Sequence, residues 1–117
     1  MRSSRPSIAR HFTGRDDNVV ATYEAILDAA RAVGPFAEDP KKTSIHLVRS
    51  TAFAGVAVQK TALVLTLKSD REIVNARIRK SERASSRRWY FEVRLAQPQD
   101  VNKQLRTWLA RSYALAG

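Results

Sequence analysis

The chain of 117 residues contains no cysteine. This absence excludes a disulfide framework, a thiolate metal site and a cysteine nucleophile. Apolar runs are also short, because the longest candidates, residues 53–58 and 62–67, fall far below the roughly 18 apolar residues that cross a bilayer. The sequence therefore predicts a cytoplasmic protein without a membrane segment, and its length suits one domain, 1–117, with one core.

Glycine and histidine are scarce, and the usual enzyme signatures are missing. The four glycines form neither a G-x-G-x-x-G nor a G-x-x-x-x-G-K-S/T phosphate loop, and no G-x-S-x-G or S-x-x-K motif occurs. The two histidines, His11 and His46, match no metal-ligand spacing. No metal, other cofactor or catalytic residue is expected, and the sequence favours a binding module over an enzyme.

Acidic residues are concentrated in one stretch, and the rest of the chain is basic. Residues 16–39 carry six acids and one base, whereas residues 40–117 carry 16 bases and five acids, and the whole chain has a formal net charge of +10. The densest basic segment runs from Arg77 to Arg88, where Glu82 is the one acid. This charge favours nucleic acid or another polyanion as the partner.

Capping chemistry and apolar spacing predict a first amphipathic helix. Thr13 and Asp16 have the spacing of a capping box. The helix is therefore expected to begin near Asp17 and to end at Gly34, which precedes a proline. Its apolar stripe is expected to contain Val20, Tyr23, Ile26 or Leu27, and Ala30.

The two ends of the chain carry different expectations. The basic arm, residues 1–12, is expected either to fray or to pack one helical turn onto the domain through Ile8 and Phe12. At the other end a closing helix is expected to begin at Pro98. Its apolar stripe is expected to contain Val101, Leu105, Trp108, Leu109 and Tyr113.

Between the helices the apolar period changes from about 3.6 to 2, which indicates strands. Strands are predicted at residues 44–50, 53–60, 61–68 and 88–95, with a weak edge strand at 73–80 and loops at 35–42 and 81–86. Short joins favour antiparallel pairing. The predicted fold is α+β: a two-layer sandwich in which an antiparallel sheet of four to five strands packs against N- and C-terminal amphipathic helices.

Strand alternation sorts the side chains of this sheet into an apolar and a polar face. Trp89 and Phe91 are expected to face the helices, and His46, Thr66, Lys68, Arg88, Tyr90 and Arg94 to emerge on the opposite face.

The first ligand hypothesis is nucleic acid, because Tyr90 beside Arg88 resembles a stacking platform for single strands. The plainer interpretation is an ordinary polar sheet face. The candidate nucleic-acid-binding residues are Arg77, Arg79, Lys80, Arg83, Arg87, Arg88 and Tyr90.

A second hypothesis is a pocket, binding or catalytic, for a small anionic metabolite. Lys42, Ser44, His46 and Arg49 lie at the entrance to a predicted strand and offer donors to a phosphate or carboxylate. Alternation turns Ser44 and His46 to one face and Arg49 to the other, unless the strand ends or bulges near Val48. The plainer interpretation is a solvated loop that leads into an ordinary strand.

A third hypothesis is an interaction domain for an acidic protein partner. The position of the arginines distinguishes these classes. A contiguous basic stripe favours a polymer, whereas a concave pocket that contains His46 favours a small ligand.

Several short motifs follow one another in a recognisable order. The string PKKTSIHL, residues 40–47, is the most specific. HFTGR precedes it, and AFAGV, RW and a closing helix with Trp108 and Tyr113 follow. This order covers nearly the whole chain and resembles a bacterial family catalogued as domain of unknown function 5655. The resemblance implies a compact α+β module, found alone or at the C-terminal end of larger bacterial proteins, some with restriction-like, nucleic-acid-processing architectures, and no assigned activity.

Overall fold

The computed structural model describes residues 5–117, with side chains from Ile8 onward. Within this range α1 (Arg5–His11) and α2 (Asp17–Val33) precede the strands, and a short 3₁₀ helix, η1 (Pro98–Asp100), and α3 (Lys103–Leu115) follow them. The strands are β1 (Ala37–Pro40), β2 (Ile45–Val48), β3 (Ala52–Val58), β4 (Leu63–Ser69), β5 (Ile78–Ser85) and β6 (Arg88–Leu95). They form an antiparallel sheet in the order β1-β2-β3-β4-β6-β5. The α+β class is confirmed, but the sheet has six strands instead of four to five.

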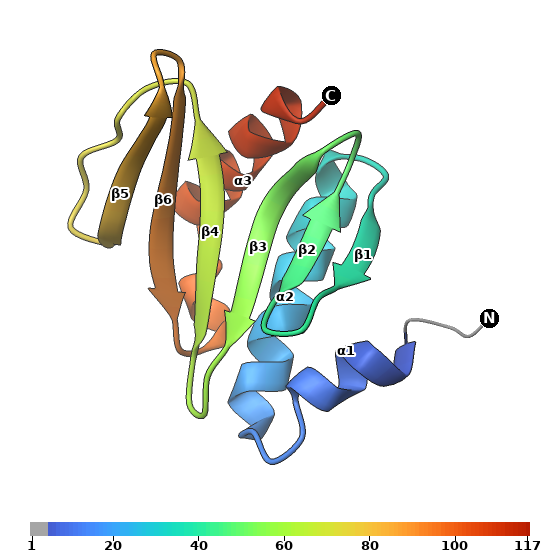
Figure 1. Ribbon diagram of the computed structural model, residues 1–117. Helices are drawn as coiled ribbons and strands as arrows, with labels where there is room; N and C mark the ends of the chain where they lie inside the picture. Colours follow the sequence, from blue (N-terminus) through green and yellow to red (C-terminus); the bar gives the residue numbers. More distant parts are fainter. Residues whose placement is uncertain (1–4) are drawn as a thin grey trace.

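Helices α2 and α3 lie against one face of the sheet (Figure 1). The core fills the space between them with fully buried side chains from both helices and from the central strands, among them Ile26, Leu105, Ile45, Leu65 and Phe91. We call the opposite side of the sheet the open face. Because partners in an antiparallel register share a face, it carries the row of His46, Gly55, Thr66 and Glu92 across β2, β3, β4 and β6.

Helix α2 spans the predicted residues, but two details differ. Asp16 is the N-cap with an extended backbone, yet its side chain makes no capping hydrogen bond, so the predicted capping box is not formed. Val20 is 39% exposed, and Val19 is buried in its place. Val19 lies four residues before Tyr23, which is one helical turn, so it continues the apolar stripe.

Two edge strands form where the alternation is weak or absent. β1 occupies part of the predicted loop 35–42, and Pro40 fits there because an edge strand tolerates a residue without an N–H. β5 begins near the end of the predicted strand 73–80 and continues through most of the predicted loop 81–86. Its residues are mostly exposed and are held by backbone pairing to β6, which requires no apolar pattern.

The two tryptophans have different surroundings. Trp108 is buried and its ring meets Phe91 edge-to-face, with the ring centroids 5.6 Å apart. Trp89 is only half-buried and lies under the Arg83 guanidinium, 5.9 Å from the ring centroid. Trp89 lies on the helix side, as alternation predicts, but the expectation that this position buries it in the core beside Phe91 is wrong, because β6 carries it to the strand end opposite Ser69, the last residue of β4.

The closing helix starts later than predicted. Pro98 begins the one-turn helix η1, and α3 begins at Lys103 after a break. Asn102 caps α3, because its side chain accepts a hydrogen bond from the Leu105 N–H at 3.0 Å. Val101, expected within the helix, fills the break and is buried.

The described part of the N-terminal arm packs onto the domain. Ile8 is buried, and the rings of Phe12 and Tyr23 are 5.0 Å apart. His11 Nε2 donates to the Lys41 carbonyl at 2.9 Å. Residues 1–4 of the predicted arm lie outside the described residues.

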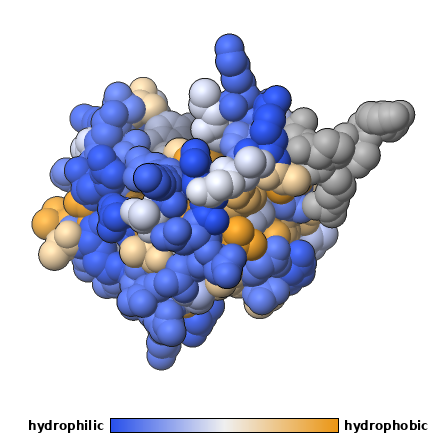
Figure 2. Space-filling view, turned by 90° about the horizontal axis from the view of Figure 1, so that it is seen from below, coloured by the Kyte–Doolittle hydropathy of each residue, from blue (hydrophilic) through white to orange (hydrophobic). Residues whose placement is uncertain are grey.

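The outer surface is mostly hydrophilic. Seen from below, hydrophilic residues cover most of the molecule, and apolar residues show between them in small areas (Figure 2). In the described range, none of the helices has the length and apolar character needed to cross a membrane.

Candidate functional site

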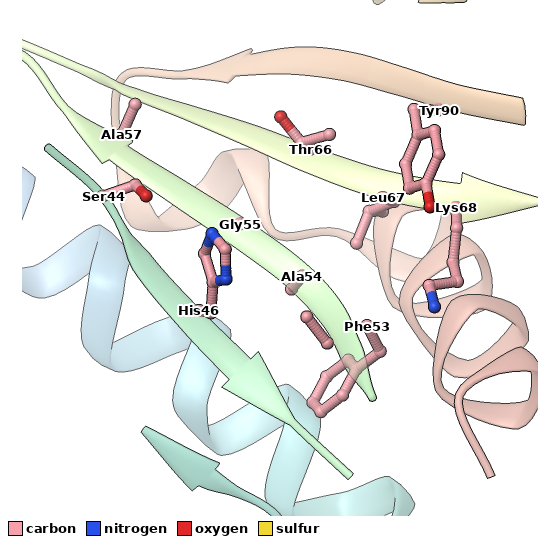
Figure 3. A pocket seen from close by; sticks show the side chains of 11 residues that line it. Ser44, His46, Phe53, Ala54, Gly55, Ala57, Thr66, Leu67, Lys68 and Tyr90 are labelled. Atoms are coloured by element: carbon pink, nitrogen blue, oxygen red, sulfur yellow. The ribbon is translucent and has the colours of Figure 1, made fainter. Parts of the chain in front are cut away.

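The open face is hollowed by a pocket of about 240 Å³ over β2, β3, β4 and β6. Ser44 and His46 stand on one side of it and Lys68 and Tyr90 on the other (Figure 3). The residues between these two sides are small or apolar, with one hydroxyl: Ala52, Phe53, Ala54, Gly55, Ala57, Thr66 and Leu67. The pocket therefore combines an apolar floor with polar walls.

Gly55 creates the floor of this pocket. It lies between His46 on β2 and Thr66 on β4, in register with both. A Cβ at Gly55 would lie 3.8 Å from His46 Cδ2 and 3.8 Å from Thr66 Cβ, which is ordinary van der Waals contact. A larger side chain would fit the backbone but would occupy the space between the walls. The absence of a side chain at this position is what leaves room for a ligand.

Ser112 of α3 separates β3 from β4 beside the pocket. Its Oγ donates to the Phe53 carbonyl at 2.6 Å and accepts from the Lys68 N–H at 2.9 Å. The regular pairing of the two strands stops one residue before, at Ala54 and Leu67, and the strands diverge from there (Figure 1). Because Phe53 and Lys68 both line the pocket, this buried serine joins the backbones of β3 and β4 where they diverge beside it.

Two cations lie near Tyr90: Lys68 lines the pocket opposite Tyr90, and Arg88, two residues before Tyr90 on the same face of β6, lies outside the lining. Lys68 is half-buried and its Nζ donates to Thr51 Oγ1 at 3.2 Å. Burial, and after it the charge of the neighbouring Arg88 guanidinium, lower the pKa of Lys68 below its usual value. Arg88 Nη1 is buried and has no hydrogen-bond partner. Within residues 8–117 neither Lys68 nor Arg88 forms an ion pair.

The model of a family described as "Domain of unknown function (DUF5655)" matches residues 8–116. The chain belongs to this family. The match includes every residue of the pocket and confirms the resemblance seen in the sequence. No curated protein and no solved structure matches the chain.

This DUF5655 domain brings together only part of the predicted anion site. Ser44 and His46 share the pocket, but Lys42 lies in an exposed loop outside its lining. Arg49 turns away, because its Nη1 donates to the Tyr113 carbonyl at 3.1 Å and its guanidinium lies 4.5 Å from the Tyr113 ring centroid. The register shift between Leu47 and Val48 does not turn Arg49 toward the pocket.

Lys68 is the cation that the predicted anion site missed. Alternation places Lys68 on the open face, but only the register of β4 and β6, which sets Lys68 opposite Tyr90, joins it to the pocket. Ser112 was also missed. Its one visible signal is its spacing, seven residues after Leu105, which puts a serine in the apolar stripe of α3.

The predicted nucleic-acid residues are spread over different surroundings. Arg77 donates to Asn102 Oδ1 at 2.9 Å and to the Asp100 carbonyl at 2.7 Å, so it braces the start of α3. Arg83 donates to the Ser85 carbonyl at 3.1 Å and covers Trp89 on the helix side of the sheet.

The remaining candidates lie closer to the open face. Arg79 approaches Glu92 Oε1 at 3.9 Å, and Lys80 is the register partner of Glu92. Arg88 and Tyr90 lie on the open face by alternation, and Arg87 is exposed before β6 begins.

In the described part of the chain, no three histidine or acidic side chains gather in an arrangement that would hold a metal ion. The donors that the pocket offers are an imidazole, hydroxyls and an ammonium, which suit hydrogen bonding to an anion.

Proposed function

We propose that this domain binds a small organic anion in the pocket of the open face. One observation carries the proposal: the pocket contains His46 and Lys68 on opposite sides of an apolar floor made by Gly55. Small-molecule sites typically have this composition, a mostly apolar cavity with a few converging polar groups. A concave pocket that contains His46 is also the feature that favours a small ligand over a polymer.

The size and shape of the pocket limit the ligand. A volume of about 240 Å³ is slightly below the roughly 300–1,000 Å³ of sites that hold drug-sized molecules. It suits a single ring that carries one anionic group. The bare backbone at Gly55 lets a flat ring approach the sheet, and the aromatic side chains of His46 and Tyr90 stand at its two sides.

The test is an NMR titration with phenyl phosphate and benzoate as probes and benzyl alcohol as the uncharged comparison. Both anions are expected to shift the ring signals of His46 and the amide signals of Gly55 and Thr66, and the alcohol is expected to bind more weakly. Gly55→Val is the matched variant, because its Cβ has room while its methyl groups fill the floor. Loss of the shifts in Gly55→Val supports the proposal, and unchanged binding in Gly55→Val contradicts it.

A second candidate function, single-stranded nucleic acid binding, is favoured by the exposed ring of Tyr90. This side chain is 37% exposed on the open face, with Arg88 two residues before it and the exposed Arg94 four residues after it on the same strand and face. Aromatic rings with adjacent cations bind successive bases and phosphates. This proposal uses fewer of the predicted arginines, since Arg77 and Arg83 already have protein partners.

Salt dependence separates the second candidate from the first. Neutralising about four phosphates of a single strand predicts that log K falls with log salt at a slope of roughly −3. Replacing Arg87 and Arg88 by Ala is expected to flatten this slope. An oligonucleotide that does not bind at about 50 mM salt, or that binds as tightly at about 200 mM, removes nucleic acid from consideration.

A further inference from the structure

Arg88 differs from the other arginines of this region in having a donor without an acceptor, and Lys68 beside it has only the Thr51 hydroxyl as a partner. Arg49, Arg77 and Arg83 each donate to a carbonyl oxygen of the protein. Arg88, by contrast, has a buried Nη1 with no hydrogen-bond partner, and its charge acts on Lys68. Buried donors in native proteins are nearly always satisfied. Among the described residues Arg88 Nη1 is the one buried side-chain polar atom without a partner, so it remains available to an acceptor that the chain itself does not supply.

The acidic side chains nearby do not neutralise this pair. Glu82 on β5 is the register partner of Tyr90. Glu92, two residues after Tyr90 on β6, lies on the same face. Glu92 approaches Arg79, and in the described residues Glu82 forms no ion pair with Lys68 or Arg88. Lys68 lines the pocket, and Arg88 lies beside it, outside the lining and two residues before Tyr90 on the same face of β6. The two positive charges therefore repel each other without a counter-charge, which costs free energy until an anion lies between them.

We propose that Lys68 and Arg88 form an oxyanion subsite, which holds the carboxylate or phosphate of the ligand at the Tyr90 side of the pocket. The Lys68 ammonium is held by Thr51 Oγ1 at 3.2 Å, which leaves further N–H donors for the ligand. Arg88 adds the donor that is now unsatisfied. Charge-assisted hydrogen bonds of this kind are the strong ones in proteins.

The subsite differs from the one that the sequence suggests. The anion lies against Lys68 and Arg88, not at the loop that carries Lys42. The organic part of the ligand then extends over Gly55 toward His46, and this part of the inference rests on the proposed function.

The experiment compares affinities of inorganic phosphate, phenyl phosphate and benzoate, measured by NMR titration. Lys68→Met and Arg88→Met are the test variants. Lys60→Met and Arg15→Met are the matched controls, because both remove an exposed cation that neither lines the pocket nor belongs to the candidate ligand-binding residues. Each test variant is expected to weaken the anions at least tenfold, since a lost charge-assisted bond changes affinity by that order. The controls are expected to stay within about twofold, and Arg88→Lys, which keeps the charge, is expected to recover part of the affinity.

The three probes distinguish a phosphate ligand from a carboxylate ligand. A phosphate carries more charge than a carboxylate, so phenyl phosphate is expected to bind more tightly than benzoate. Inorganic phosphate is expected to bind more weakly than phenyl phosphate, because it lacks the ring that covers the floor. The opposite order, with benzoate tightest, would assign the subsite to carboxylates while leaving the role of the two cations intact.

The outcomes also separate this inference from the proposed function. If Gly55→Val loses phenyl phosphate while Lys68→Met and Arg88→Met retain it, the subsite is wrong and the pocket function stands. If inorganic phosphate depends on Lys68 and Arg88 while Gly55→Val binds every probe normally, the subsite stands and the pocket function is wrong. No binding of any probe at about 10 mM overturns both.

A readout on the unmodified chain covers the case in which a variant does not fold. The Lys68 ammonium is titrated by NMR with and without phosphate. The polar and charged groups placed near Lys68 by contact or by register are Thr51, Arg88, Tyr90, Glu82 and Glu92. Asp70, two residues after Lys68, is paired with Arg71. A bound oxyanion favours the charged ammonium, so the pKa of Lys68 is expected to rise on adding phosphate. An unchanged pKa at saturating phosphate overturns the subsite.

Discussion

Ser112→Ala removes the hydroxyl that joins β3 and β4 beside the pocket. Ser112 is fully buried, and its Oγ is bonded to the Phe53 carbonyl at 2.6 Å and to the Lys68 N–H at 2.9 Å. The substitution deprives two backbone groups of this partner, and a buried polar group left unsatisfied costs about 1–3 kcal/mol. Allowing for partial relaxation, we expect the free energy of unfolding to fall by about 2–4 kcal/mol, a large part of the roughly 5–15 kcal/mol of a typical domain.

Urea denaturation followed by tryptophan fluorescence measures this loss. With an m value of about 1–3 kcal/mol per M, the midpoint is expected to fall by about 1–2 M without a change in slope. Thr107→Ala is the matched control on the same helix, because its exposed hydroxyl only bonds the Lys103 carbonyl at 3.0 Å, and we expect a change below about 0.5 kcal/mol. A loss below about 1 kcal/mol in Ser112→Ala would show that β3 and β4 close and bond each other directly, which refutes the role of Ser112 as a spacer.

Three further predictions follow from the packing and the charges. Gly55→Val is expected to leave the thermal midpoint unchanged or raise it, because a valine suits a strand better than glycine and its Cβ meets no clash; a marked loss of stability would mean that the floor is already filled. Trp108→Ala is expected to cost about 3–5 kcal/mol in chemical denaturation, and Trp89→Ala clearly less, because Trp89 is only half-buried; equal costs would contradict this. Arg88→Met is expected to raise the pKa of Lys68, measured by NMR, because the nearby positive charge is removed; no rise would mean that burial alone lowers it.

The elements that were predicted well are those whose side chains carry a regular apolar pattern. β6 has the bounds expected from its alternation, since Phe91, Val93 and Leu95 must all face the core. α2 follows its apolar stripe up to Gly34, where a Cβ would collide with the Tyr113 ring. Burial of apolar area determines such segments, so their pattern is visible in the sequence.

Edge strands lack that signal. β1 and β5 are held by backbone hydrogen bonds to one neighbour each, and the side chains of β5 are mostly exposed. A polar segment such as 81–86 therefore has the composition of a loop although it forms a strand. Trp89 was misplaced for a related reason, because alternation gives the face of a residue but not how far the covering helix extends.

The site was predictable only as a face of the sheet. Alternation correctly places His46, Thr66, Lys68 and Tyr90 on the side away from the helices. That they surround one pocket depends on the register across three strand pairs and on the bare backbone of Gly55. The separation of β3 and β4 beside the pocket involves Ser112, whose contact with both strands arises from helix packing. Such long-range relations leave no local pattern in the sequence.

The most direct test of the central claim locates the ring of a bound probe. Intermolecular NOEs are measured between the ring protons of phenyl phosphate and the protein. A ligand in the pocket predicts NOEs to the Gly55 Hα, the Ala57 methyl and the Thr66 methyl, which all belong to the pocket lining. NOEs confined to residues outside this lining, or none at saturating phenyl phosphate, would contradict the account.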